Sequence, residues 1–135
     1  MNLKGVESDM TKRLTPVEDG RMKSEGSIQK DILAYLKTVP HVTCWRSNAG
    51  QVKTNVKMAP KGCPDIIGYT TMSTYDSLKG SLGRGKFIGF EVKQPGKLQN
   101  PDQQDWEADM TAAGALYYVV HSVEETQEII ERLFG

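Results

Sequence analysis

The chain has 135 residues, of which 38% are apolar, with 17 acidic and 17 basic side chains. This length and composition suit a single domain with a buried core. No segment approaches the roughly 18 apolar residues of a membrane span, and the N-terminal residues lack the apolar stretch of a signal peptide, so we expect a cytoplasmic protein. Cys44 and Cys63 form neither a C-x-x-C pair nor a cluster with histidines, so neither a disulfide framework nor a zinc site is indicated.

Charge is unevenly distributed along the chain although the net charge is zero. Between Lys37 and Lys97 there are ten basic and three acidic residues, whereas from Leu98 onward eight acidic residues accompany Arg132 alone. This distribution favours one face for a polyanion such as nucleic acid and one for solvent. The alternative is that both faces are simply solvated.

The first 23 residues are polar and contain few apolar side chains. We predict that residues 1–23 form a flexible extension and that residues 24–135 form the folded domain. A helix is predicted over Ser24–Val39, because apolar residues recur at helical spacing and Pro40 stops it. Glu25 in its first turn has a structural explanation, since a carboxylate there interacts favourably with the helix dipole.

Two strands with a basic loop between them are predicted next. Val42–Arg46 is the first, and the loop Ala49–Gly62 contains lysines and no acid, which suits contacts with phosphates. A short apolar strand follows with Asp65 at its entrance, where a Pro-Asp turn is the structural alternative. Thr70–Gly85 is rich in Ser, Thr and Gly and is either a long hairpin loop or a mobile flap.

The segment Lys86–Lys93 is predicted to be a buried strand, because β-branched and aromatic residues lie between a Gly-rich loop and the turn at Pro95-Gly96. Side chains two apart on a strand share a face, so Glu91 and Lys93 project together. A simple ion pair at the strand end is the structural alternative.

The last third of the chain is predicted to form a helix, a strand and a second helix. Asn100 caps the first helix, which ends near Ala113, with Gln103 at the capping-box position. The uniformly apolar strand Leu116–Val120 is expected to be interior and parallel to a neighbour. A second capping box over Ser122–Glu125 opens the last helix. The predicted order is α-β-β-β-α-β-α, an α/β fold with a central sheet flanked by helices.

Asp65 and Glu91 are expected to lie close together, because the strands that carry them are hairpin neighbours. Neighbouring carboxylates repel each other unless a cation lies between them. A hard divalent ion, Mg²⁺ or Mn²⁺, suits the available oxygen ligands, which are these carboxylates, the Val92 carbonyl and water. Lys93 beside such a site can orient a water molecule and offset charge on a phosphate, which indicates phosphodiester hydrolysis.

These residues resemble the PD-(D/E)xK nucleases, whose two signature strands match Pro64-Asp65 and Glu91-Val92-Lys93. The chain is most similar to the small stand-alone VRR-NUC branch found in phages and bacteria. The further matching segments are Ser24-Glu25 with Ile28-Gln29, Arg46-Ser47-Asn48-Ala49-Gly50, Gly62-Cys63, and Gln103 with Trp106 and Gly114. This resemblance implies a restriction-endonuclease-like core with a mixed sheet.

The resemblance also implies roles for individual residues. Glu25 would complete the metal shell of Asp65 and Glu91, Lys93 would be catalytic, and Gln103 would steady the site. Gln104 replaces Gln103 if the register shifts by one. The residues that we expect to contact DNA phosphates are Arg46, Asn48, Lys53, Lys57 and Lys97.

Other candidates are assigned no chemistry. Trp45 and Trp106 are expected to pack in the core or on a helix face rather than stack on bases. His41 and His121 are isolated histidines.

The function predicted from the sequence is a Mg²⁺- or Mn²⁺-dependent endonuclease that recognises DNA structure, in the cytosol of a bacterium or of a phage-infected host. One domain cuts one strand, so branched DNA such as a Holliday junction calls for a homodimer. The alternatives are a catalytically silent nucleic-acid-binding module of the same fold and a restriction-type or flap nuclease.

Overall fold

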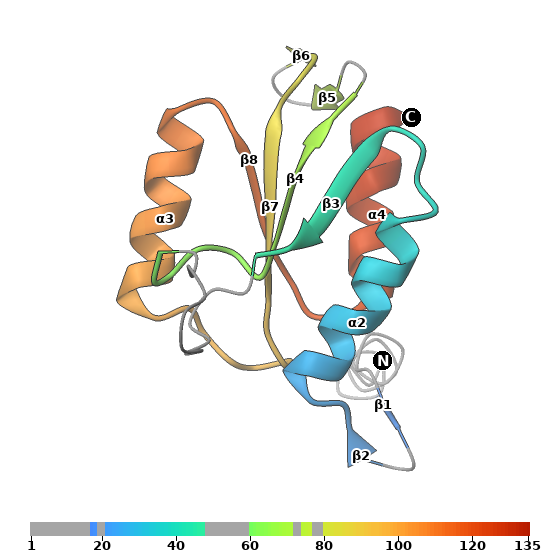
Figure 1. Cartoon of the computed structure of the whole chain (residues 1–135), viewed down its shortest axis with the longest axis vertical. Helices are drawn as coiled ribbons and strands as arrows, with labels where there is room; N and C mark the ends of the chain where they lie inside the picture. Colours follow the sequence, from blue (N-terminus) through green and yellow to red (C-terminus); the bar gives the residue numbers. More distant parts are fainter. Residues whose placement is uncertain (1–16, 19–20, 48–59, 72–73, 77–79) are drawn as a thin grey trace, which may run out of the picture.

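A four-stranded sheet lies at the centre of the computed structural model (Figure 1). The structure describes residues 17–18, 21–47, 60–71, 74–76 and 80–135. The sheet consists, in spatial order, of β3 (Val42–Arg46), β4 (Ile66–Thr70), β7 (Phe87–Val92) and β8 (Leu116–Val120). The first three strands are antiparallel to one another and β8 is parallel to β7, so the sheet is mixed. The predicted α/β class is therefore confirmed.

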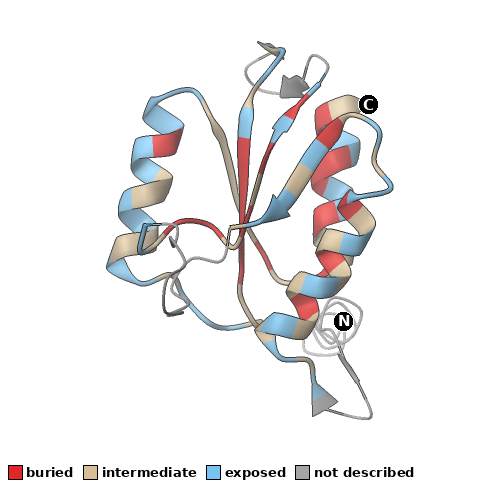
Figure 2. Cartoon of the chain, in the orientation of Figure 1, coloured by how far each residue is buried: buried red, intermediate tan, exposed pale blue. Residues whose placement is uncertain are grey.

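Helices cover both faces of this sheet (Figure 1). They are α2 (Glu25–Leu36) and α4 (Val123–Phe134) on one face and α3 (Pro101–Ala112) on the other. Figure 2 shows the buried residues of α2 and α4 on the sides that face the sheet. There they join the buried side chains of the strands, among them Ile66, Ile88 and Phe90, in one hydrophobic core. No helix in the described part of the chain is long and apolar enough to cross a membrane.

The order of elements differs from the prediction by two short hairpins. One consists of β1 (Val17–Glu18) and β2 (Arg21–Met22). It lies within the stretch predicted to be a flexible extension, of which residues 1–16 and 19–20 lie outside the described residues. The other consists of β5 (Thr74–Asp76) and β6 (Gly80–Gly83), so the described part of Thr70–Gly85 agrees with a hairpin.

The strand β8 is parallel to its neighbour as predicted, but it lies at an edge of the sheet rather than in its interior. Its apolar sequence has another cause, because α3 packs against one of its faces and α4 against the other. An edge strand covered on both faces needs apolar side chains on both, just as an interior strand does.

The predicted caps fix where the helices begin. The Ser24 hydroxyl accepts a hydrogen bond from Ser27 N at 3.2 Å, and α2 ends at Leu36, three residues earlier than predicted. Ser122 caps α4 by accepting from Glu125 N at 3.1 Å. The Glu125 side chain does not complete the predicted capping box, since it accepts from the backbone N–H of His121 at 2.7 Å and contacts that imidazole.

Candidate active site

The pairing of β4 with β7 brings Asp65 close to Glu91. Ile66 is opposite Phe90 in the register, so the residue that precedes β4 lies beside the end of β7. One carboxylate oxygen of Asp65, Oδ2, accepts a hydrogen bond from the backbone N–H of Val92 at 2.8 Å. Asp65 is therefore attached to the strand that carries Glu91, as the sequence predicted.

Ser47, which follows β3, holds the segment before β4 in place. Its backbone N–H donates to the carbonyl oxygen of Asp65 at 2.9 Å, and its hydroxyl donates to the carbonyl of Pro64 at 2.5 Å. This serine lies in one of the segments that resemble the nuclease family, and no role was predicted for it. Its position directly after a strand and before the basic loop was the available signal.

Glu91 is the most deeply buried acidic residue among the described side chains, with 2% of its surface exposed. Its neighbours Phe90 and Val92 point into the core under α2 and α4. Glu91 therefore points to the opposite face of the sheet, the one on which α3 lies, as the predicted alternation requires. Its Oε1 accepts a hydrogen bond from Gln103 Nε2 at 2.7 Å. Its Oε2 is buried and has no hydrogen-bond partner among the described residues.

Both carboxyl groups have raised pKa values. Burial, followed by repulsion from Asp65, raises the pKa of Glu91 to about 9. Burial also raises the pKa of Asp65, although the hydrogen bond from the Val92 N–H partly offsets this effect. Each group is thus poorly compensated when ionised, and a cation close to both would stabilise their ionised forms.

Lys93 lies one residue beyond β7 and is half-buried. Its backbone N–H donates to the Val120 carbonyl of β8 at 3.0 Å, which fixes its position at the end of the sheet. Its ammonium charge lowers the pKa of both Glu91 and Asp65, and so partly offsets the effect of burial.

Glu25 approaches the site from the first turn of α2. The carbonyl of the neighbouring Lys23 accepts from Gln94 Nε2 at 2.8 Å, which ties the start of this helix to the segment after β7. The carboxylate of Glu25 lies 4.0 Å from Lys97 Nζ, and its charge contributes to the raised pKa values of Asp65 and Glu91. No group of three His, Cys, Asp or Glu side chains in the described ranges is arranged to hold a metal ion.

Gln103 has two partners, and these join the start of α3 to the site. Its Oε1 accepts from the Asn100 backbone N–H at 2.9 Å and its own N–H donates to Asn100 Oδ1 at 2.9 Å, which completes the predicted capping box. Its Nε2 binds Glu91 at the same time. Gln104, the alternative for a shifted register, is exposed.

Substituting Gln103 with alanine is expected to lower the free energy of unfolding by about 1–3 kcal/mol, because the Asn100 N–H and a buried carboxyl group both lose a partner. Gln104→Ala is the matched control and is expected to change stability by less than about 0.5 kcal/mol, since its side chain is exposed. Urea unfolding at pH 7 measures both values. Equal stability of the two variants would contradict the double role of Gln103.

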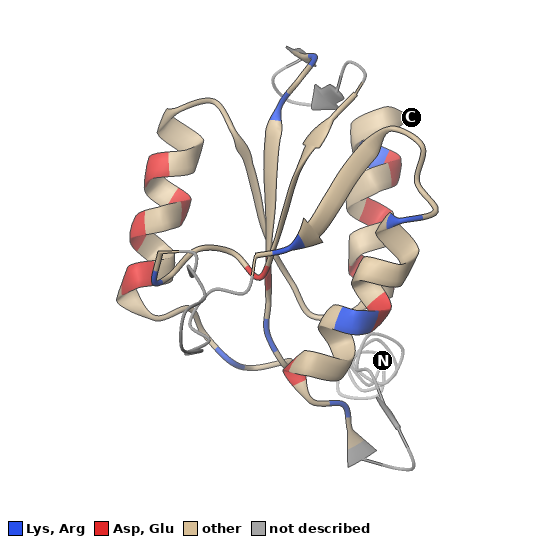
Figure 3. Cartoon of the chain, viewed as in Figure 1, with Lys and Arg blue, Asp and Glu red and all other residues tan. Residues whose placement is uncertain are grey.

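The predicted phosphate contacts are only partly within the described residues. Arg46 ends β3 and is exposed, whereas Lys97 faces Glu25. The others, Asn48, Lys53 and Lys57, lie outside the described residues. Figure 3 shows acidic residues along α3 and α4, so these helices carry the acidic residues of the C-terminal third.

The two tryptophans differ from each other. Trp106 is half-buried and its indole Nε1 donates to the carbonyl of Lys61 at 3.0 Å, so it packs on a helix face as predicted. Trp45 is 45% exposed, and the expectation that it is buried in packing was wrong. Trp45 lies on the same face of the sheet as α3. That helix packs against β8 at the opposite edge of the sheet, so it does not cover Trp45.

A divalent cation fits the residues that the structure brings together. Asp65 and Glu91 supply only oxygen ligands, and the buried Glu91 Oε2 has an unused acceptor. Hard cations such as Mg²⁺ and Mn²⁺ prefer these ligands.

The chain matches no protein-family model, no curated protein and no solved structure.

Proposed function

We propose that this protein is a Mg²⁺- or Mn²⁺-dependent endonuclease that hydrolyses phosphodiester bonds in DNA, with a PD-(D/E)xK core of the VRR-NUC type. The observation that carries the proposal is the pair of carboxyl groups of Asp65 and Glu91. Glu91 is buried with an oxygen that has no partner among the described residues, both groups have raised pKa values, and Lys93 directly follows the strand that carries Glu91. Burying two ionisable carboxyl groups close together lowers the stability of the fold, so a functional requirement is the expected reason for their presence.

Each residue of the site has a role in this proposal. Asp65, Glu91 and the Val92 carbonyl would hold the ion. Glu25, which the described structure does not group with the other two carboxylates as a metal site, would be a further oxygen ligand. A bound ion of this kind lowers the pKa of its water and offsets charge on the phosphate. Lys93 orients the attacking water and stabilises negative charge on the phosphoryl group, while Gln103 keeps Glu91 in position. Arg46, Asn48, Lys53, Lys57 and Lys97 contact the phosphates on either side.

We further propose that the protein acts on branched DNA as a homodimer in the cytoplasm. One domain with one site cuts one strand, so symmetric cuts in a four-way junction need two copies. A catalytically silent DNA-binding module of the same fold would have no need for the buried carboxyl pair.

The test is cleavage of end-labelled four-way junction, flap, splayed and linear duplex DNA in Mg²⁺, Mn²⁺ or EDTA. We expect cleavage of branched substrates that requires metal and falls by about 10²–10³-fold in Lys93→Ala, because the charge-stabilising ammonium is lost. Lys30→Ala is the matched control, since Lys30 is exposed on α2. Cleavage that persists in EDTA, or full activity of Lys93→Ala, would contradict the proposal.

A further inference from the structure

Three large aromatic side chains are exposed on the sheet face that carries Glu91. Trp45 on β3, Tyr69 on β4 and Phe87 on β7 have 45%, 46% and 41% of their surface exposed. The helix on this face, α3, packs against β8, and its Met110 lies beside Gly89 of β7 together with Pro64. The rings therefore lie on β3, on β4 and at the start of β7, and we call them the aromatic row.

The rings of the aromatic row adjoin one another. Tyr69 and Phe87 are direct partners in the register of β4 with β7. The ring centroids of Trp45 and Tyr69 are 6.2 Å apart at an interplanar angle of 64°, an edge-to-face contact. Such a contact leaves at least one ring face open. The row thus offers a continuous apolar surface across three strands.

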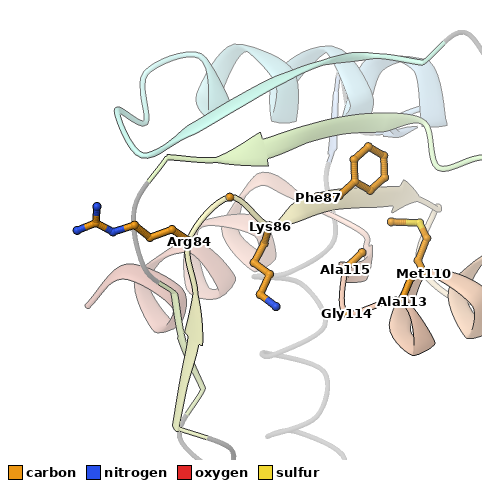
Figure 4. Close-up of a pocket in the computed structure, with 8 residues that line it drawn as sticks. Arg84, Lys86, Phe87, Met110, Ala113, Gly114 and Ala115 are labelled. Carbon is orange, nitrogen blue, oxygen red and sulfur yellow. The ribbon is translucent and has the colours of Figure 1, made fainter.

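Basic side chains lie at the Phe87 end of the aromatic row. Arg46, at the Trp45 end, is exposed but alternates to the opposite face of β3. Phe87 lines a cavity of about 480 Å³ together with Arg84, Lys86 and Met110. Figure 4 shows the side chains of Arg84 and Lys86 on one side of this cavity and those of Phe87 and Met110 on the other. Positive charge therefore accompanies the exposed rings.

We propose that the aromatic row binds unpaired bases of single-stranded DNA, with Arg84 and Lys86 contacting its phosphates. Exposed rings flanked by cations are the combination that single strands need, because bases stack on aromatic faces and the backbone carries negative charge. In a duplex the base faces are already stacked on one another, so the row selects for unpaired segments. An apolar protein partner would leave these two cations without counterions.

The distance between the aromatic row and the carboxyl pair indicates which substrate the proposed nuclease prefers. This step rests on the proposed function. Trp45 is opposite Ile67, which is opposite Gly89, and Glu91 is two residues further along β7 on the same face. With strands about 4.8 Å apart and a rise of about 3.3 Å per residue, Trp45 and Glu91 lie about 12 Å apart in the sheet. The preferred substrate then has unpaired bases beside the scissile phosphate, as flaps, splayed ends and opened junctions do.

The test measures binding of the full chain to fluorescently labelled oligo(dT), oligo(U) and a blunt DNA hairpin by anisotropy in EDTA. We expect oligo(dT) to bind more tightly than the hairpin and at least as tightly as oligo(U). Trp45→Leu is expected to weaken oligo(dT) binding by about 5- to 150-fold, the range for loss of one stacking ring. Trp45→Phe keeps an aromatic ring, so its affinity for oligo(dT) should be closer to that of the wild type.

Two further variants keep the test sharp. Tyr69→Leu should weaken oligo(dT) binding as Trp45→Leu does, so the inference does not depend on the folding of one variant. Met22→Ala is the control, because Met22 is 49% exposed on β2 but lies outside the aromatic row. Thermal unfolding verifies that each variant is folded.

Several results would overturn the aromatic row as a single-strand site. These are unchanged affinity in Trp45→Leu and Tyr69→Leu, equally tight binding of the hairpin, and tighter binding of oligo(U). A dimer that dissociates in Trp45→Leu would assign the row to a second copy of the chain instead. Because binding is measured without metal, absence of cleavage would overturn the nuclease and leave aromatic-dependent binding standing.

Discussion

Replacing Glu91 with glutamine is expected to abolish metal-dependent cleavage and, at the same time, to stabilise the metal-free protein. Glutamine keeps an oxygen to accept from Gln103 Nε2 and places an amide where the unpartnered Oε2 now lies. That amide can donate to the Asp65 carboxylate, and it carries no charge that burial would oppose. The free energy of unfolding at pH 8 should rise by about 1–3 kcal/mol.

The pH dependence of stability follows from the same group. The pKa of Glu91 is raised from 4.5 to about 9 in the folded protein, so between these values the folded state binds more protons than the unfolded chain. The free energy of unfolding of the metal-free protein should therefore fall as the pH rises from about 5 to 9. In Glu91→Gln this fall should be smaller.

Urea unfolding in EDTA at pH 5, 7 and 9 measures both effects. Glu128→Gln is the matched control, because Glu128 is exposed on α4, and its pH profile should follow that of the wild type. Two results would contradict this prediction and show that the fold stabilises the ionised form of Glu91. One is a wild-type free energy of unfolding that rises over this pH range, and the other is a Glu91→Gln variant that is less stable than the wild type at pH 8.

Gly68→Ala is expected to lower the free energy of unfolding by at least about 3 kcal/mol, because a methyl group there has no space. Gly68 is buried in β4 opposite Cys44 of β3. A Cβ at this position would overlap the backbone oxygen of Thr43 and lie 2.8 Å from Cys44 Cα. Backbone atoms of a paired strand cannot move aside without loss of the pairing.

Gly26→Ala is the control for this second effect. Gly26 is exposed in α2, and a Cβ there meets nothing within 4 Å. Alanine should raise stability by about 0.5–1 kcal/mol, since glycine in a helix loses more backbone entropy on folding. Thermal and urea unfolding should show that the two substitutions change stability in opposite directions. A Gly68→Ala variant as stable as the wild type would show that β3 and β4 separate easily.

Local signals explain most of what the sequence predicted. A helix cap is decided by a few adjacent residues, so Asn100 and Ser122 were correctly predicted to cap α3 and α4. For α2 the sequence allowed either Ser24 or Ser27 as the cap, and the structure shows that it is Ser24. Strand alternation is equally local, and it placed Glu91 on the face opposite Phe90. The proximity of Asp65 to Glu91 followed because antiparallel neighbours were the simplest connection for the two strands.

Features that depend on distant contacts could not be predicted in this way. The edge position of β8 depends on which strands pair, and its apolar sequence is the same in either place. Glu125 contacts His121 rather than the Ser122 N–H, a choice between donors one residue apart. The exposure of Trp45 depends on where α3 lies, and nothing near Trp45 in the sequence specifies that.

The hydrogen bond between the Lys93 N–H and the Val120 carbonyl has a consequence for how the site is made during folding. The groups around Glu91 come from α2, β4, β7 and α3, and the strand that holds Lys93 in place is the second-last element of the chain. Contacts between residues so far apart in sequence form slowly, because the intervening loops must close first. On the ribosome, the residues up to Val92 alone cannot form this arrangement, and the site is assembled only after β8 has been synthesised.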